Sequence, residues 1–312
     1  MKAFLRDQKF IKEINRIYHE EEAELYDAGH PEIFEREEET WRKLSRFLPA
    51  GVGDRRILDI GSGTGFVAEM LLPHLTEGDA LVLTDISSKM LAQAKRKLRG
   101  PGGPALEFSL VDAEALPFPD FSFDVVTMNS VLHHLPDTAR FLAEAARVLR
   151  PGGVLIIAHE PNRAFFTNAF LRLISWFLQK CAGLTARLKR LGERRLAGGR
   201  LDAWTEIYRR INQRLREGGF TADDLLPQEI QSYVDFHSPT AAGGADASKG
   251  FAIRELLERL PGCQRAFFKT RAHLGKINPH GHPILFYLDA LLSFLFPASG
   301  SSLSAVFRKE MP

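Results

Sequence analysis

The chain has 312 residues, 45% of them hydrophobic and 26% charged, and its formal net charge is +2. This is the composition of an ordinary globular protein, and a net charge so close to zero argues neither for nor against nucleic acid. The two cysteines, Cys181 and Cys263, lie far apart and outside any metal-ligand pattern. The sequence therefore predicts no disulfide framework and no metal site, and it fits a cytoplasmic protein. Charges recur in the first nine residues, so we expect no signal peptide.

Residues 1–50 are predicted to form an N-terminal helical arm. Glutamates crowd the polar positions, while Phe34, Trp41, Leu44 and Leu48 follow at helix-like spacing. Pro49-Ala50-Gly51 then ends the arm.

From residue 55 the pattern changes to strands that alternate with helices. Strand-like segments lie at 56–60, 80–84, 105–111, 123–128 and 153–158, and helices at 66–75, 87–98 and 138–149. This alternation predicts an α/β core, residues 51–162, built on a doubly wound, mainly parallel sheet. Ligands of such sheets bind beyond the carboxyl ends of the strands.

After Glu160 the alternation stops. Residues 163–249 are predicted to be a mainly helical insertion after the fifth strand, which acts as a lid or substrate cap. Residues 250–312 complete the sheet, with a helix at 251–260, strand-like runs at 264–274 and 303–309, and an apolar helix at 284–296. That apolar run is too short to span a bilayer and contains Asp289, so we expect a buried or interfacial helix.

The turn after the first strand reads Asp59-Ile60-Gly61-Ser62-Gly63-Thr64-Gly65. Glycines at this spacing permit a tight turn and close approach of a ligand, and the following helix N-terminus offers N–H groups to an anion. A dinucleotide fold would need a small residue where Phe66 stands, so it fits poorly. A glycine-rich connection without a ligand is the structural alternative.

Acidic residues follow the next two strands. Asp85 ends the second strand, where a carboxylate can accept hydrogen bonds from both ribose hydroxyls of a nucleoside. Asp112-Ala113 follows the third, where an acid suits an adenine amine. Helix capping and turn formation are the structural alternatives for the two acids.

Four segments carry a family resemblance when they are taken together. They are ILDIGSGTG (57–65), LTDIS (83–87), VDAEALPFPDFSFDVVTMNSVLHHL (111–135) and RVLRPGGVLII (147–157). In this order and spacing they resemble the class I S-adenosylmethionine-dependent methyltransferases, within them the ubiquinone/menaquinone biosynthesis branch (methyltransferase type 11 domain). The resemblance covers about residues 55–160. It implies a seven-stranded Rossmann-like methyltransferase fold, S-adenosyl-L-methionine as cofactor and S-adenosyl-L-homocysteine as product.

The resemblance also implies roles for matching positions. Asp59, Gly61, Ser62, Gly63 and Gly65 would hold the methionine part, and Asp85 the ribose. Ile86 would pack on the adenine, and Asp112 would reach the adenine amine, with Ala113 supplying a backbone contact. Asn129 and Ser130 would lie beside the sulfonium. Tyr26, in the arm, resembles a residue that closes over the cofactor.

Methyl transfer needs a base only when the acceptor must lose a proton. The candidates follow the fourth and fifth strands: His134 first, then His133, His159 and Glu160. Local packing and hydrogen bonding are an equally good explanation of each. His237, beside a Ser-Pro turn at the end of the insertion, is a candidate substrate contact or a structural residue.

The insertion combines an apolar segment, 164–180, with a basic continuation. The basic residues are Arg187, Lys189, Arg190, Arg194, Arg195, Arg200, Arg209, Arg210, Arg214 and Arg216, opposed only by Glu193, Asp202 and Glu206. Such a pattern suits the inner face of an anionic membrane or the cap of an apolar substrate tunnel, or it is a packed helix with a solvated basic face. Nucleic acid is a minor alternative, because aromatics are sparse and the fourth strand ends in Met128-Asn129-Ser130-Val131.

Two hypotheses follow. The first is a methyltransferase that acts on a small or lipid-like hydrophobic acceptor, at oxygen or carbon. The second is a non-catalytic cofactor-binding module that docks on a membrane or partner through its basic helices. The sequence does not identify the acceptor or the oligomeric state.

Overall fold

The computed structural model describes residues 7–50, 54–98, 100, 102–190, 198–239, 250–275 and 283–311. One seven-stranded sheet lies at its centre, with strand order β3-β2-β1-β4-β5-β7-β6. The strands are β1 (Arg56–Ile60), β2 (Ala80–Asp85), β3 (Ala105–Leu110), β4 (Phe123–Asn129), β5 (Leu149–Pro161), β6 (Cys263–Arg271) and β7 (Ser302–Lys309). β1 to β5 pair in parallel, and β7 runs antiparallel to both β5 and β6. The predicted doubly wound, mainly parallel sheet is confirmed.

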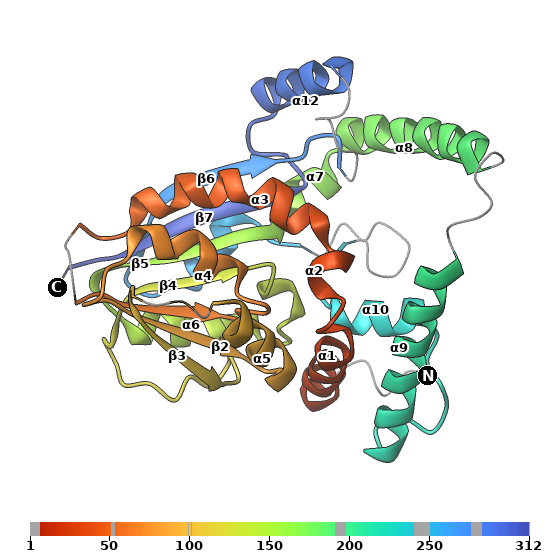
Figure 1. Ribbon diagram of the computed structural model, residues 1–312. Helices are drawn as coiled ribbons and strands as arrows, with labels where there is room; N and C mark the ends of the chain where they lie inside the picture. The colour runs from red at the N-terminus through yellow and green to blue at the C-terminus, as the bar shows by residue number, and fades with distance from the viewer. Residues whose placement is uncertain are drawn as a thin grey trace.

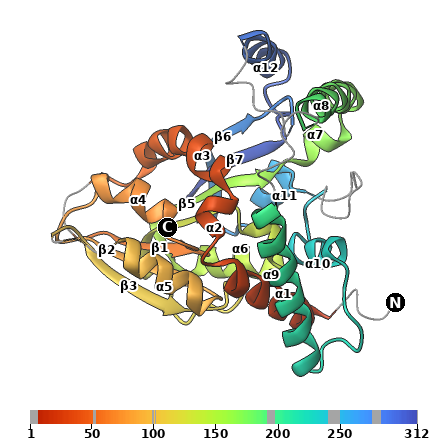
Figure 2. The same ribbon diagram turned by 45° about the vertical axis from the view of Figure 1, so that its right-hand side comes forward.

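Helices cover both faces of the sheet, because successive strand residues point to opposite sides (Figure 2). Ile57 packs under α3 (Pro31–Leu44), α4 (Phe66–Leu71) and α5 (Ser88–Lys97), whereas Leu58 packs under α6 (Thr138–Val148) and α11 (Ile253–Glu258). Side-chain caps begin two of these helices. Ser87 Oγ accepts from the Met90 N–H, and an Asp137 oxygen accepts from the Arg140 N–H.

The first helix of the arm joins two helices of the insertion beside the sheet (Figure 1). The arm consists of α1 (Gln8–Glu22), α2 (Tyr26–Gly29), α3 and the 3₁₀ turn η2 (Ser45–Phe47). α1 packs against α9 (Gly198–Glu217) and α10 (Pro227–Val234) through buried residues such as Ile14, Ile211 and Ile230. Segments almost 200 positions apart in sequence therefore share one small apolar core.

The basic residues in the described part of α9 meet more acids than the local sequence indicates. Acids of the arm, absent from the local sequence, reach it: Arg214 binds Glu20 at 2.6 Å and Glu21 at 2.8 Å. Arg209 and Arg210 bind Glu206, and Arg216 binds Asp224. The predicted basic residues Arg187, Lys189, Arg190, Arg194, Arg195 and Arg200 have side chains outside the described part of the chain.

Two element boundaries differ from the sequence prediction. The segment predicted as one helix at 66–75 forms α4 and then the 3₁₀ turn η3 (Leu72–His74). The α-helix stops before Pro73 because proline cannot donate a helical hydrogen bond. The helix predicted at 138–149 ends at Val148, and β5 already begins at Leu149. Pro151-Gly152-Gly153 therefore lies within a strand, where the pairing with β4 shifts register and Gly152 has φ +80°.

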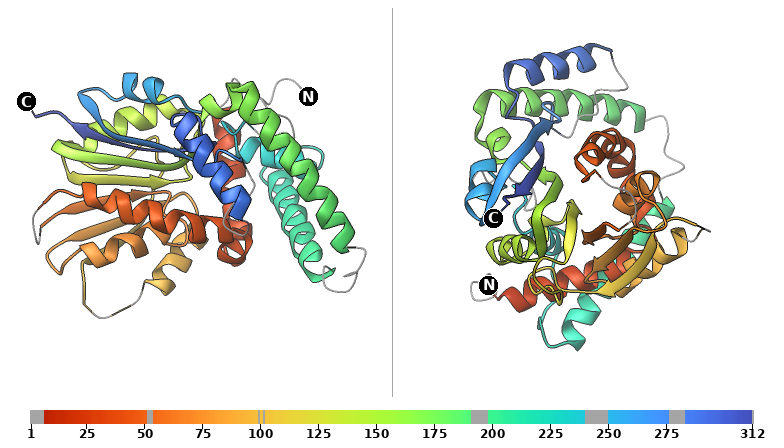
Figure 3. Two further views of the ribbon diagram at one scale, coloured as in Figure 1. Left: turned by 90° about the horizontal axis from the view of Figure 1, so that it is seen from above. Right: turned by 90° about the vertical axis from the view of Figure 1, so that its left-hand side faces the viewer.

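Three further helices extend beyond the sheet. α7 (Arg163–Thr167) and α8 (Ala169–Arg190) follow β5, and α12 (Pro283–Leu295) precedes β7. α8 and α12 lie side by side to one side of the sheet (Figure 3). No helix in the described ranges is long and apolar enough to cross a membrane.

Candidate active site

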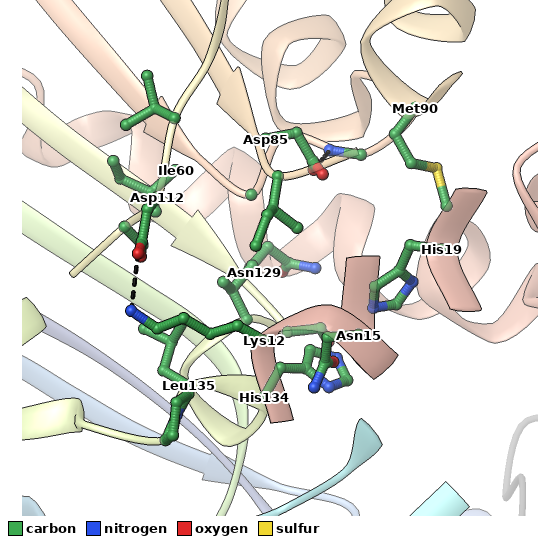
Figure 4. A pocket seen from close by; sticks show the side chains of 18 of the residues that line it. Lys12, Asn15, His19, Ile60, Asp85, Met90, Asp112, Asn129, His134 and Leu135 are labelled. Atoms are coloured by element: carbon green, nitrogen blue, oxygen red, sulfur yellow. Dashed lines mark hydrogen bonds and ion pairs between the residues drawn. The ribbon is translucent and has the colours of Figure 1, made fainter. Parts of the chain in front are cut away.

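A cavity lies at the carboxyl ends of the parallel strands. Its walls come from the turns after β1, β2, β3 and β4, from the 3₁₀ turn η4 (Leu132–His134), and from α1 and α2 of the arm (Figure 4).

The glycine turn after β1 forms one wall. Gly61 has φ +60°, and a Cβ there would lie 2.5 Å from a Val131 methyl group, so only glycine fits. Gly63 has φ +52° and open space where a Cβ would be. Ser62 and Gly65 do not line the cavity. Ser62 instead binds the Thr84 carbonyl through its N–H at 2.8 Å.

Asp85 lines the cavity together with Ile86. One Asp85 oxygen accepts from the Gly63 N–H at 2.9 Å and the other from the Ser87 N–H at 2.8 Å. Burial raises the pKa of Asp85. Because a carboxylate has about four lone-pair sites, each oxygen retains acceptor capacity for a ligand hydroxyl.

Asp59 is fully buried and does not line the cavity. One of its oxygens accepts from Thr127 Oγ1 at 2.8 Å, and the other has no hydrogen-bond partner among the described residues. Burial raises the pKa of Asp59 to about 7, although the Thr127 hydrogen bond acts in the opposite direction.

Asp112 and Ala113 line the cavity after β3. One Asp112 oxygen accepts from the Glu114 N–H at 2.9 Å, and the other lies 2.7 Å from the Lys12 ammonium. Lys12 also lies 2.6 Å from the Glu114 carboxylate. The expected adenine contact would therefore share Asp112 with a lysine of the arm (Figure 4).

Asn129, Ser130 and Tyr26 also line the cavity. Trp41 of α3 donates its indole N–H to Asn129 Oδ1 at 3.0 Å. This hydrogen bond fixes the orientation of the amide, so that Asn129 has its NH₂ group as a donor at the end of β4. Ser130 has φ +57°, which turns the chain sharply from β4 into η4.

Glu160 is completely buried and anchors η4 to β5. It accepts from the main-chain N–H groups of Val131, Leu132 and His133 at 2.7, 2.8 and 3.2 Å. His133 Nδ1 adds a fourth contact at 2.8 Å. Burial lowers the pKa of His133, but the charge and hydrogen bond of Glu160 and the charge of Asp235 together outweigh it, so the pKa is raised. Neither residue lines the cavity, so both position η4.

His134 is the histidine of η4 that lines the cavity. Its Nδ1 lies 2.7 Å from the Val234 carbonyl oxygen. Because a carbonyl only accepts, Nδ1 carries the hydrogen in the neutral ring and Nε2 is the unprotonated nitrogen. Burial and the neighbouring His133 and His19 hold the pKa of His134 well below its usual value.

The two other candidate histidines lie outside the cavity lining. His159 Nδ1 binds Glu37 at 2.7 Å, and Arg271 binds the same carboxylate. The His237 N–H donates to the His133 carbonyl at 2.9 Å. In this arrangement both residues support neighbouring segments.

Nitrogen and oxygen atoms of His133, His134 and Asp235 lie within 4.8 Å of one another, a spacing that a metal ion could use. The Asp235 carboxylate is 3.7 Å from His133 Nε2 and 3.6 Å from His134 Nδ1. His134 Nδ1 is already committed to the Val234 carbonyl, so the hydrogen-bonded cluster accounts for the grouping without an ion.

Comparison with known proteins relates this geometry to a family. A family model described as a methyltransferase domain matches residues 58–157. Demethylmenaquinone methyltransferase from Thermus thermophilus is 38% identical over 218 residues, which cover 70% of this chain and 84% of that protein. The chain belongs to the S-adenosylmethionine-dependent methyltransferases.

Other methyltransferases match over shorter segments. The 27-O-demethylrifamycin SV methyltransferase from Amycolatopsis mediterranei is 35% identical over 50% of this chain and 54% of its own. Among the other relatives, the match spans about half to two thirds of the relative's length. A Haloferax volcanii methyltransferase, solved in complex with the Trm112 activator, shares the fold at 16% identity with a TM-score of 0.50, over 94% of this chain and 98% of its own.

The cavity of this methyltransferase fits the family's cofactor. Open space at Gly63 leaves room for a ligand against the turn, and buried Asp85 presents acceptors one strand away. The Asp85 acceptors match a ligand that has hydroxyl donors.

Sequence reasoning missed the cavity residues of α1: Lys12, Asn15 and His19. Their spacing places them on one helix face, and this polar stripe interrupts the apolar residues Ile14 and Ile17. That stripe was a usable signal. The pairing of α1 with the cavity was not, because it depends on contacts with α9 and α10.

Proposed function

We propose that this protein transfers a methyl group from S-adenosyl-L-methionine to a small hydrophobic acceptor, at an oxygen or a carbon atom. The observation that carries the proposal is that one cavity is lined both by the turns after the strands and by His134, whose Nε2 is unprotonated. When bound, the cofactor supplies a methyl group on a positively charged sulfur. Gly61, Gly63, Asp85 and Asp112 are the residues that would hold it.

The acceptor half of the cavity is built from α1 and η4. Val131, Leu135 and Pro136 give it apolar surface. Asn15 is almost fully buried there and donates its amide to the Ile11 carbonyl at 2.9 Å. Its Oδ1 has no hydrogen-bond partner among the described residues. We assign this oxygen to a hydroxyl of the acceptor, because a buried acceptor left unpaired is costly.

His134 acts as the base in this proposal. Its Val234 hydrogen bond fixes the ring with Nε2 as the proton acceptor, and its low pKa keeps it neutral near pH 7. A neutral imidazole takes a proton more readily from a phenolic hydroxyl than from an aliphatic alcohol, because the phenol is the stronger acid. The acceptor class that fits is therefore a phenol or hydroquinone. This agrees with the quinone precursor in the name of the Thermus relative.

The test uses His134→Gln, with His74→Gln as the matched control. His74 belongs to η3 and does not line the cavity. Methyl transfer from labelled cofactor is measured on demethylmenaquinol, on simple phenols and on fractionated lipid extract, and cofactor affinity is measured by calorimetry. We expect His134→Gln to lower kcat about 10²–10⁴-fold with cofactor affinity unchanged, and His74→Gln to keep both.

Three outcomes would contradict the proposal. Full activity in His134→Gln would remove this residue as the base. Cofactor binding without turnover on every acceptor fraction would favour the non-catalytic module. Absence of cofactor binding, with Asp85→Ala indistinguishable from the wild type, would remove the cofactor assignment itself.

A further inference from the structure

α8 and α12 together expose an apolar surface, which we call the α8/α12 face. Its residues are Phe170, Leu173, Trp176 and Phe177 of α8 and Ile284, Phe286, Tyr287, Leu291, Phe294 and Leu295 of α12. Each side chain is 47% to 80% exposed. Large exposed apolar surfaces mark sites of interaction with other proteins or with membranes.

The opposite sides of the two helices are packed against the rest of the protein. Their inner residues, among them Leu171, Ile174 and Leu292, form a buried cluster with residues of α7. The Ser175 hydroxyl donates to the Leu274 carbonyl at 3.2 Å, which ties α8 to the segment after β6. The outward residues therefore belong to a folded helix pair that extends beyond the sheet (Figures 1 and 3).

Cations outnumber acids in the segments that form the face, and one of them, Arg163, is paired with Glu255. The sequence from Pro161 to Gly192 has six cationic residues and no acid: Arg163, Arg172, Lys180, Arg187, Lys189 and Arg190. The described side chains of Arg172 and Lys180 are exposed, and the Lys180 ammonium lies over the Trp176 ring at 5.9 Å. Asp289 is the acid of α12, and its carboxylate accepts from the Leu274 N–H at 3.1 Å.

We propose that the α8/α12 face docks on an anionic lipid bilayer and lies in its headgroup layer. Apolar side chains enter the acyl boundary, cations contact lipid phosphates, and Trp and Tyr favour the interface itself. A second copy of the chain is a poorer occupant, because two such faces would bring like charges together. The proposal does not depend on methyl transfer.

The experiment measures binding of the full chain to vesicles by co-sedimentation. Vesicles of phosphatidylcholine and phosphatidylglycerol in equal parts are compared with pure phosphatidylcholine, at low and high NaCl. The test variant is Trp176→Ser with Phe294→Ser. The matched control is Leu110→Ser with Leu226→Ser, since these leucines are 61% and 62% exposed on β3 and before α10.

We expect binding to the anionic vesicles that weakens with salt, falls about tenfold or more in the test variant and persists in the control. Quenching of tryptophan fluorescence by brominated lipid provides a second readout. It should disappear in Trp176→Phe, which retains Trp41 and Trp204. This single variant keeps the test valid if the double variant does not fold.

Absence of vesicle binding by the wild-type chain would overturn the proposal, and so would equal binding by the test variant. Sedimentation velocity without lipid tests the alternative occupant, a second copy of the chain. A dimer that the test variant abolishes, with no vesicle binding, would assign the face to a second copy. Each of these results leaves the methyl-transfer assay unaffected, so the two proposals fail separately.

Discussion

Among single residues, two buried carboxylates near the site differ in how many hydrogen bonds they accept. Glu160 accepts four hydrogen bonds and fixes η4, whereas Asp59 accepts one and retains an unpartnered oxygen. The sequence assigned Asp59 to the cofactor and Glu160 to the candidate bases, but it did not show how many hydrogen bonds each would accept. Their difference depends on which N–H groups the folded chain directs at each carboxylate.

Asp59 should make stability depend on pH. Its pKa is raised from an ordinary value near 4 to about 7, so the folded state keeps a proton that the unfolded state releases. This contribution is complete below about pH 4 and is lost as the pH rises to about 7. We therefore compare the free energy of unfolding of Asp59→Asn with that of the wild type, both without cofactor. The variant-minus-wild-type difference should be more positive at pH 8 than at pH 4, by up to about 4 kcal/mol.

Urea unfolding of both proteins at pH 4 and pH 8 measures this change. The comparison between variant and wild type cancels the raised pKa values of His19 and His133 and the lowered pKa of His134, which the two proteins share. The same difference at both pH values would show that Asp59 titrates normally.

At the scale of elements, α1 is the segment with the largest departure from expectation. It was predicted as part of an arm, yet Lys12, Asn15 and His19 line the cavity. α1 keeps this position through the apolar cluster with α9 and α10, where Ile14 is completely buried.

Ile14→Ala should therefore loosen α1 and weaken cofactor binding. Deletion of a buried isoleucine side chain down to alanine costs about 2–5 kcal/mol. Hydrogen exchange of α1 amides should accelerate, and the calorimetric Kd for cofactor should rise. Leu142→Ala is the control, because Leu142 is equally buried but lies in the core under α6. Equal loss of cofactor affinity in both variants would indicate a global effect and contradict a specific role for α1.

At the scale of the whole molecule, β7 holds the C-terminal segment in the sheet. It lies between β5 and β6 and contributes the fully buried Ala305, Val306 and Phe307. A chain that ends at Gly300 would leave the edges of two strands unpaired. We expect it to be insoluble or unfolded by circular dichroism, whereas removal of Met311 and Pro312 should leave the melting temperature within a few degrees. A soluble, folded chain ending at Gly300 would contradict this.

The sequence predicted the sheet well because each of its strands is a short apolar run between turn signals. The residues Gly61, Gly63, Asp85 and Asp112 are local in sequence and all line the cavity, and their role in cofactor binding stays a prediction. The sequence did not predict contacts between residues that lie far apart in the chain. The Arg214 contacts with Glu20 and Glu21, and the position of α1 over the cavity, depend on folding of the chain and leave no signal in either segment alone.

The position of α1 has a consequence for the timing of turnover. The same helix carries Lys12, beside the proposed adenine contact, and Asn15, in the proposed acceptor half. Any displacement of α1 that admits the cofactor therefore also opens the acceptor half. We expect the spent cofactor and the methylated product to depart in a shared opening event, so that one helix movement sets the pace at which both sites are reloaded.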